Sequence, residues 1–167
     1  MNALGSLRLV RKWPILVAAS LLLPVMTGCS NDKSTDPPDE RTAFFPEDFE
    51  QSYTMVRDCR GPSHDHADSY VTVWADPSSA QSYLEGDYPF PVGAVIVKVL
   101  HTDASCAVVR QYDVMKKGPA GTAPDRGDWL WQEVRPDRTV LSQGVQQVCV
   151  SCHVGCAAGR DYTCTDP

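Results

Sequence analysis

Short runs of apolar and β-branched residues recur along the middle of the chain and alternate with polar positions. Side chains that point to opposite faces of a sheet repeat with a period of two, so this alternation is typical of strands. By this pattern we predict four strands, over residues 70–74, 94–100, 107–115 and 129–134. Segments rich in glycine and proline predict loops or turns at 59–66, 87–93 and 118–127.

Three other segments are predicted to be helical, from the spacing of their apolar residues or from residues that favour helix ends. Phe49, Tyr53 and Val56 recur at helical spacing and predict an amphipathic helix over 47–57. Asp76 as N-cap and Pro77 at the first helical position predict a short helix that begins there. Residues 140–150 are expected to form a helix that leads to Cys149. A chain of 167 residues without internal repeats is expected to hold one small domain.

The amino-terminal segment has the features of an export signal. Three basic residues precede an apolar run at 15–23, and this run is too short for a comfortable membrane span. Small residues then lead to Cys29, and this pattern resembles the lipobox of bacterial lipoproteins, with Met26 where leucine is usual. We therefore predict a lipoprotein signal peptide at 1–28. A plain secretory signal cleaved nearby is the alternative.

The lipoprotein hypothesis predicts how the mature chain begins. Cys29 would be acylated and become the new amino terminus. The polar, proline-bearing segment 29–41 would be a flexible tether, in front of a folded domain at 42–167.

Loss of the signal changes the charge of the protein. The full chain has 15 basic and 21 acidic residues, and segment 1–28 contains Arg8, Arg11 and Lys12 but no acid. The mature protein is therefore about nine charges negative. This charge argues against nucleic acid as a partner and favours small neutral or cationic ligands and basic redox proteins.

The sequence Cys149-Val150-Ser151-Cys152-His153 is a C-x-x-C-H motif near the carboxyl end. Two thiols one helical turn apart can add to the two vinyl groups of one haem, and the imidazole that follows can bind the iron. We predict one covalent haem c, held by Cys149 and Cys152, with His153 as iron ligand. A zinc half-site and a redox-active dithiol are the alternatives, whereas a disulfide within the motif would close a very small, strained loop.

The remaining cysteines suggest disulfides. After lipid and haem have taken three of the seven, Cys59, Cys106, Cys156 and Cys164 remain, and an exported protein meets an oxidising environment. Four thiols allow three connectivities. Sequence proximity favours Cys59 with Cys106 and Cys156 with Cys164. The alternative is that one or more stay free.

Five segments follow one another in an order that carries a family resemblance. They are Phe90-Pro91-Val92-Gly93-Ala94-Val95-Ile96-Val97-Lys98, Tyr112-Asp113-Val114-Met115-Lys116-Lys117, Gly127-Asp128-Trp129, the C-x-x-C-H motif, and Asp161-Tyr162. This order resembles the cytochrome P-460 family, which includes the cytochromes c′-beta, from about Tyr70 to the end. The resemblance implies an α+β fold, with a mainly antiparallel β-sheet and a few flanking helices. It also implies an iron bound by His153 on one side and open on the other.

Members of this family differ at the lysine of the first segment. In true P-460 members that lysine is covalently linked to the haem and the protein oxidises hydroxylamine. In c′-beta members the link is absent and the site binds nitric oxide. Lys98 occupies the matching position. The chain departs from the family in its four extra cysteines, in Val99 where an acidic residue often follows, and in a very short tail.

The position of Lys98 within an apolar strand raises the question of its charge state. Strand alternation places it on one face with Ile96 and Leu100, away from Val97 and Val99. A buried ammonium is costly unless it is paired or deprotonated, so a neutral, nucleophilic amine beside the haem is one hypothesis. The other is an amine that reaches water or pairs with a haem propionate.

The next predicted strand supplies candidates for the distal pocket. Arg110 and Tyr112 are expected to share a face, from which either could contact a haem ligand, a propionate or only solvent. Met115 and Met55 are the methionines of the mature chain and could each be a sixth iron ligand.

His64-Asp65-His66 is a rival metal site, since two imidazoles flanking a carboxylate can bind a divalent cation. The sequence shows no third ligand for this site, and solvated loop histidines are common.

These expectations combine into one hypothesis with alternatives. The protein is expected to be a lipid-anchored haem c protein of the bacterial cell envelope that faces the periplasm. It would oxidise hydroxylamine or a related small nitrogen compound and pass electrons to a redox partner protein, as a monomer or a homodimer. A non-enzymatic cytochrome that binds nitric oxide or transfers electrons is the alternative. A zinc-binding lipoprotein is a more distant one.

Overall fold

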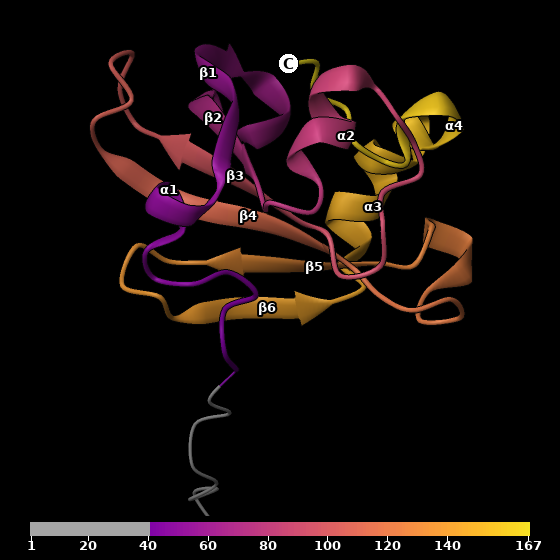
Figure 1. Ribbon diagram of the computed structural model, residues 1–167. Helices are drawn as coiled ribbons and strands as arrows, with labels where there is room; N and C mark the ends of the chain where they lie inside the picture. Colours follow the sequence, from indigo (N-terminus) through magenta and orange to yellow (C-terminus); the bar gives the residue numbers. More distant parts are fainter. Residues whose placement is uncertain (1–40) are drawn as a thin grey trace, which may run out of the picture. The chain divides into compact units, whose positions relative to one another are not determined.

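The computed structural model describes residues 41–167, which form one antiparallel sheet with short helices around it (Figure 1). The six strands lie in the order β1-β2-β3-β4-β5-β6, so each strand pairs with its neighbour in the sequence. The α+β class with a mainly antiparallel sheet is confirmed. The strands are β1 (Thr54–Ser63), β2 (Ser69–Ala75), β3 (Val95–His101), β4 (Val109–Lys117), β5 (Trp129–Val134) and β6 (Val140–Gly144). The helices are α1 (Phe49–Ser52), η1 (His64–His66), α2 (Ala80–Glu85), η2 (Pro124–Arg126), α3 (Gln147–His153), η3 (Val154–Cys156) and α4 (Ala157–Arg160).

The sheet is apolar on both faces at its centre. On the side of α2 and α3, Ile96 and Leu100 pack with Trp129 and Trp131, and we call this side the helix face. On the opposite side Val97 packs with residues that precede β1, and we call this side the N-terminal face. The predicted alternation along β3 is therefore confirmed, with Ile96 and Leu100 in one core and Val95, Val97 and Val99 in the other.

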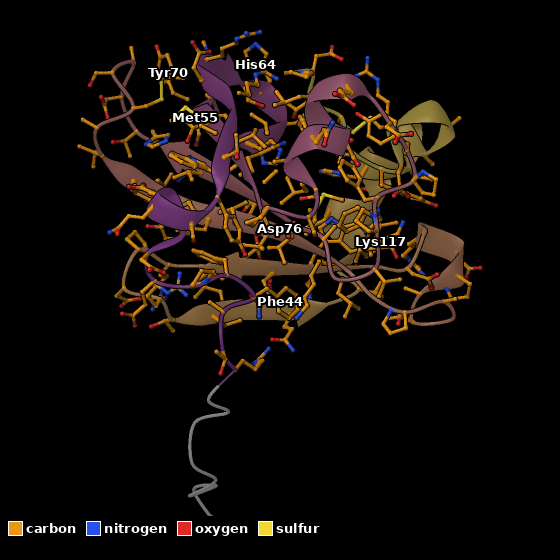
Figure 2. All side chains as sticks on the ribbon, in the orientation of Figure 1. Phe44, Met55, His64, Tyr70, Asp76 and Lys117 are labelled. Atoms are coloured by element: carbon orange, nitrogen blue, oxygen red, sulfur yellow. A yellow bond between two sulfur atoms is a disulfide. The ribbon has the colours of Figure 1, made fainter. Side chains whose placement is uncertain are left out.

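Different parts of the chain cover the two faces. Helices α2, α3 and α4 gather at one end of the sheet, whereas α1 lies apart from them (Figure 1). Lys117 lies beside the helices, and Phe44 lies near β5 and β6 (Figure 2). The backbone N–H of Phe44 donates to Gln132 of β5 at 2.8 Å, which fixes the start of the domain to the sheet.

The four predicted strands are all present, with ends that differ by at most two residues from the expected ones. Strands β1 and β6 were not predicted, and both are edge strands of the sheet. Edge strands need only one partner and carry weaker alternation than central ones. Strand β1 also shifts its register against β2 three times, which breaks the period of its side chains.

The helix predicted over 47–57 is wrong beyond Ser52. Only Phe49–Ser52 is helical, and the chain enters β1 at Thr54. Of the three residues that suggested one helical stripe, Phe49 and Tyr53 pack on the N-terminal face and Val56 on the helix face, so they belong to different cores. The loop predicted over 59–66 is also wrong, since β1 runs to Ser63 and η1 follows it.

The helix predicted over 140–150 is wrong in its first half. Residues Val140–Gly144 alternate between half-buried and exposed positions and pair with β5 as strand β6. Gly144 has a φ of 107°, a conformation that disfavours other residues, and it separates the strand from the helix. Helix α3 therefore begins only at Gln147, but it carries the C-x-x-C-H motif as expected.

Asp76 does not cap α2 as predicted, because the helix begins at Ala80 and Ser79 is its N-cap residue. The Asp76 carboxylate instead accepts hydrogen bonds from the backbone of Ser78 at 3.0 Å and of Val95 at 2.8 Å. It therefore holds the turn after β2 against the start of β3.

The predicted signal peptide, the acylated Cys29 and nearly all of the tether lie outside the described residues. Within residues 41–167 no helix has the length and apolar character that a membrane span requires.

Candidate functional site

A cavity of about 290 Å³ lies on the helix face of the sheet, where α3 crosses it. Its apolar wall comes from the central strands and includes Ile96, Leu100, Met115 and Trp131. Polar side chains of the same strands, among them Lys98, Asp113 and Glu133, line it as well. All three residues of the predicted haem motif, Cys149, Cys152 and His153, belong to this wall.

Helix α3 presents its two thiols without a bond between them. Cys149 is half-buried and Cys152 is exposed, and both are free. The other four described cysteines form the disulfides Cys59–Cys106 and Cys156–Cys164, which is the pairing favoured by sequence proximity. Burial raises the pKa of Cys149 to about 12, with smaller contributions from Asp113 and Glu133, so this group remains a neutral thiol at neutral pH.

The orientation of His153 is fixed from behind. Its Nδ1 lies 2.6 Å from the carbonyl oxygen of Tyr162, an acceptor, so Nδ1 carries the proton and donates it. The lone pair of the ring is then on Nε2. Burial lowers the pKa of His153, which keeps the imidazole neutral and able to bind a metal. The ring meets Trp131 edge to face, with 6.4 Å between centroids.

The Tyr162 carbonyl is itself held by a buried ion pair next to it. The carboxylate of Asp161 accepts two hydrogen bonds of 2.7 Å from the amine of Lys117 and one of 2.9 Å from the backbone of Phe90. The indole N–H of Trp129 donates to the Asp161 carbonyl at 2.8 Å. The Cys156–Cys164 disulfide spans the same tail. Sequence reasoning named Lys117, Asp161 and Tyr162 only within the segments of the family resemblance and assigned none of them a role.

Lys98 points into the cavity, where it joins a polar chain that the sequence did not reveal. Its Nζ lies 2.9 Å from Nε2 of His66, and Nδ1 of His66 lies 3.0 Å from Oδ2 of Asp113. The side-chain amide of Gln111 donates to the other oxygen of Asp113 at 2.6 Å. Burial lowers the pKa of Lys98, and the charge of Asp113 opposes the shift. The amine is thus easier to deprotonate than an exposed lysine.

The rival metal site at His64 and His66 is not formed. His64 is exposed and pairs with Asp68 at 2.5 Å, whereas His66 turns toward Lys98 and Asp113. Among residues 41–167 no group of three or more histidine, cysteine or acidic side chains is placed to hold a metal ion.

The expectation that Arg110 and Tyr112 share a face is wrong. A register shift between β3 and β4 near Val109 reverses the alternation there. Arg110 lies on the cavity wall and donates to Ser69 at 3.1 Å and to the Ala67 carbonyl at 3.2 Å. Tyr112 packs on the N-terminal face against aromatic rings, so it does not reach the cavity.

The two methionines are placed differently. Met115 is buried on the cavity wall, whereas Met55 is 44% exposed on β1 and is not part of that wall.

Fold and cavity together define a class of protein. A small antiparallel sheet carries a cavity with apolar and charged side chains, where one helix presents an imidazole and two unbonded thiols, and these features suit a haem-binding cytochrome. The chain belongs to the Cytochrome P460 family, whose family model matches residues 46–165. A comparison with curated proteins finds no match.

Proposed function

We propose that this haem-binding cytochrome carries a single haem c, attached through Cys149 and Cys152 with His153 as iron ligand, and that it oxidises hydroxylamine or a related small nitrogen compound. The observation that carries the proposal is that α3 and the central strands bring the two free thiols, the imidazole and Lys98 to one cavity.

The residues present fit a covalent haem. Addition of a thiol to a vinyl group forms one C–S bond and moves the thiol hydrogen to carbon, so it requires no oxidant. The thiols of Cys149 and Cys152 are not bonded to each other or to another cysteine, so both are free for this addition. His153 presents Nε2, because its Nδ1 is occupied by Tyr162. Bound haem would supply a redox-active iron that takes up single electrons and binds small ligands.

The polar chain on the cavity wall suits the proton chemistry of the reaction. Removal of two electrons from hydroxylamine releases two protons (NH₂OH → HNO + 2H⁺ + 2e⁻), and the electrons would pass to an acceptor protein. His66 and Asp113 lie 3.0 Å apart at the cavity and can accept and hand on such protons. The side chains of His66 and Asp113 are 18% and 23% exposed, which leaves a route to solvent.

A second candidate function is the storage or transport of nitric oxide without oxidation. The apolar wall of Ile96, Leu100 and Met115 favours a small neutral ligand. His66 offers the amine of Lys98 a hydrogen-bond partner at 2.9 Å, which could hold the lysine as an unlinked amine in this second function.

The proposed setting of this activity is the bacterial cell envelope. The export signal and Cys29 support a lipid-anchored domain that faces the periplasm, and covalent haem attachment in bacteria takes place outside the cytoplasm. Two disulfides accord with an oxidising compartment. A basic electron acceptor, and assembly as a homodimer, are proposed with it.

Haem peptides from the purified protein test both the attachment and the reaction. We expect haem to survive denaturing electrophoresis in the wild type and to be lost when Cys149 and Cys152 are both replaced by alanine. If the protein is the oxidase, the tryptic haem peptide contains the Lys98 segment as well as residues 149–153, and Lys98→Met abolishes hydroxylamine oxidation. Arg135→Gln, at an exposed position away from the cavity, is the control.

The two candidate functions give different outcomes in this experiment. A haem peptide with residues 149–153 alone, together with tight nitric oxide binding, would exclude the oxidase and support the carrier. Haem that is lost from the wild type on denaturation would contradict covalent attachment.

A further inference from the structure

A second cavity, of about 320 Å³, lies next to the first. Asp65, Lys98 and Thr165 line both cavities, so the two are neighbours. The rest of the second wall comes from β1, η1 and Val71 of β2, and it includes Arg57 and Arg60. Neither the haem motif nor the hydroxylamine reaction gives this cavity a role.

Arg57 is the feature of this cavity that lacks an explanation. It faces Val73 of β2, between two register shifts of β1, and is half-buried. Its Nε is buried and has no hydrogen-bond partner among residues 41–167. A guanidinium stays charged at any physiological pH, and a buried N–H donor of a charged group that lacks an acceptor is costly. Such a group is stabilised when an anion occupies the space beside it.

The basic side chains that line this cavity outnumber its one acidic side chain, which favours an anion. Arg60 also lines the cavity. Its ion pair with Asp58, at 3.4 Å, is weak because the side chains of both residues are exposed to solvent. Asp65 is the acidic residue of the wall and is itself exposed. Burial lowers the pKa of Lys98 and Asp113 opposes this shift, whereas Arg57 adds to it and Asp65 opposes it, so charges of the second cavity act on Lys98 across the shared wall. This cluster of positive charge belongs to a chain with a formal net charge of −6.

We propose that the second cavity is an anion site, in which Arg57, assisted by Arg60, binds one carboxylate or small oxyanion through paired guanidinium N–H donors. Two parallel N–H groups match the two oxygens of such an anion. The anion has two sources: a propionate carboxylate of a haem in the neighbouring cavity, or a free oxyanion from solution. The propionate form rests on the proposed function, whereas the free-anion form does not.

Nitrate titration and resonance Raman spectroscopy of the haem-loaded protein test the site. The proteins are the wild type, Arg57→Gln, and Arg135→Gln as a control that removes the same charge at an exposed position outside both cavities. For a free anion, calorimetry finds saturable one-to-one nitrate binding to the wild type that weakens about tenfold or more in Arg57→Gln, the effect of losing a charge-assisted hydrogen bond. For a propionate, the wild type does not bind nitrate, and the propionate bending band shifts in Arg57→Gln only.

The proposal is overturned if Arg57→Gln changes neither readout, or if Arg135→Gln changes them equally. Should the glutamine variant not fold, Arg57→Lys keeps the charge and the aliphatic stem but not the paired donors. It is then expected to show weaker nitrate binding or a shifted band, and no change in either would overturn the site. If the purified protein holds no haem at all, the propionate form fails with the proposed function, and nitrate titration still decides the free-anion form.

Discussion

At the scale of single residues, the buried carboxylate of Asp161 links the tail of the chain to the iron ligand proposed above. Asp161 and Tyr162 both have positive φ, of 44° and 68°, so this part of the backbone needs side-chain contacts to hold it. The contacts of Asp161 with Lys117 and Phe90 provide them. They place the Tyr162 carbonyl where it selects the tautomer of His153.

We expect Asp161→Asn to destabilise the protein by about 3 kcal/mol, because it leaves the ammonium of Lys117 buried without a counter-charge. Asparagine tolerates positive φ, so the backbone geometry is preserved and the loss of charge is isolated. Denaturant unfolding at neutral pH measures the effect.

Asp166→Asn is the control for this change. Asp166 pairs with Arg160 at the surface, where both side chains are well exposed, and its loss is expected to cost less than about 1 kcal/mol. Equal effects of the two substitutions would mean that the Lys117–Asp161 pair does not hold the tail.

Residues of the site differed in how far the sequence revealed them. The common placement of Cys149, Cys152 and His153 on one cavity wall could be predicted, because their spacing is local to one helix. Lys98 and Asp113 face each other as a cross-strand pair of β3 and β4, which only the register shows. His66 joins them from a segment 32 residues before Lys98 in sequence. Tyr112 was assigned to the wrong face because a bulge is not visible in the pattern.

At the scale of elements, Asp76 connects β2, α2 and β3. Its carboxylate receives hydrogen bonds from Ser78 and Ser79, before α2, and from the backbone of Val95 at the start of β3. Burial by itself would raise the pKa of Asp76, but the hydrogen bonds from Ser78, Ser79 and Val95 together outweigh it, and the pKa is lowered. The folded state therefore prefers the ionised carboxylate.

This preference predicts an acid-dependent loss of stability. A lowered pKa stabilises the fold above the pKa of the unfolded chain, near 4, and the stabilisation disappears as pH falls through the folded value. We expect Asp76→Asn to cost about 1 kcal/mol at pH 7 and to make stability less sensitive to pH below about 4. Urea unfolding at a series of pH values measures both.

Asp87→Asn, at an exposed position in the turn after α2, is the matched control and should leave the pH profile unchanged. If Asp76→Asn keeps the full acid sensitivity of the wild type, the carboxylate of Asp76 does not contribute to it.

The errors at the scale of elements have a common physical cause. Phe49, Tyr53 and Val56 fit a helix by spacing, yet pairing with β2 fixes residues from Thr54 onward as a strand. Residues 140–144 likewise gain their strand conformation from β5, including a 2.6 Å hydrogen bond from Ser142 to Glu133. Long-range pairing decides such edge segments, whereas central strands such as β3 carry enough apolar residues to be recognised alone.

At the scale of the whole molecule, the meander is the simplest sheet order that the predicted strands allow. Each connection joins neighbouring strands, so strand order follows sequence order once the strands are known. The sheet has a second core on its N-terminal face, built around Phe45 and Phe49, which the sequence did not predict. Ala43, Phe44 and Phe45 pack in this core, so they mark where the described chain enters the domain.

That entry point bears on how the protein is placed in the cell, and leads to a prediction about Cys29. Segment 29–41 is polar and contains Pro37 and Pro38, and we propose that it is a spacer between a lipid and the domain. A single acyl chain gives only marginal membrane binding, whereas the several chains of a bacterial lipoprotein anchor it stably.

We expect the wild type to partition into detergent, and Cys29→Ser to stay unprocessed or to appear in the aqueous phase. Ser30→Cys in the wild-type background is the control, since it adds a thiol without moving Cys29 and should not change the partition. Equal partition of wild type and Cys29→Ser into the aqueous phase, with both chains cleaved near residue 28, would instead identify a plain secretory signal and a domain that is free in the periplasm.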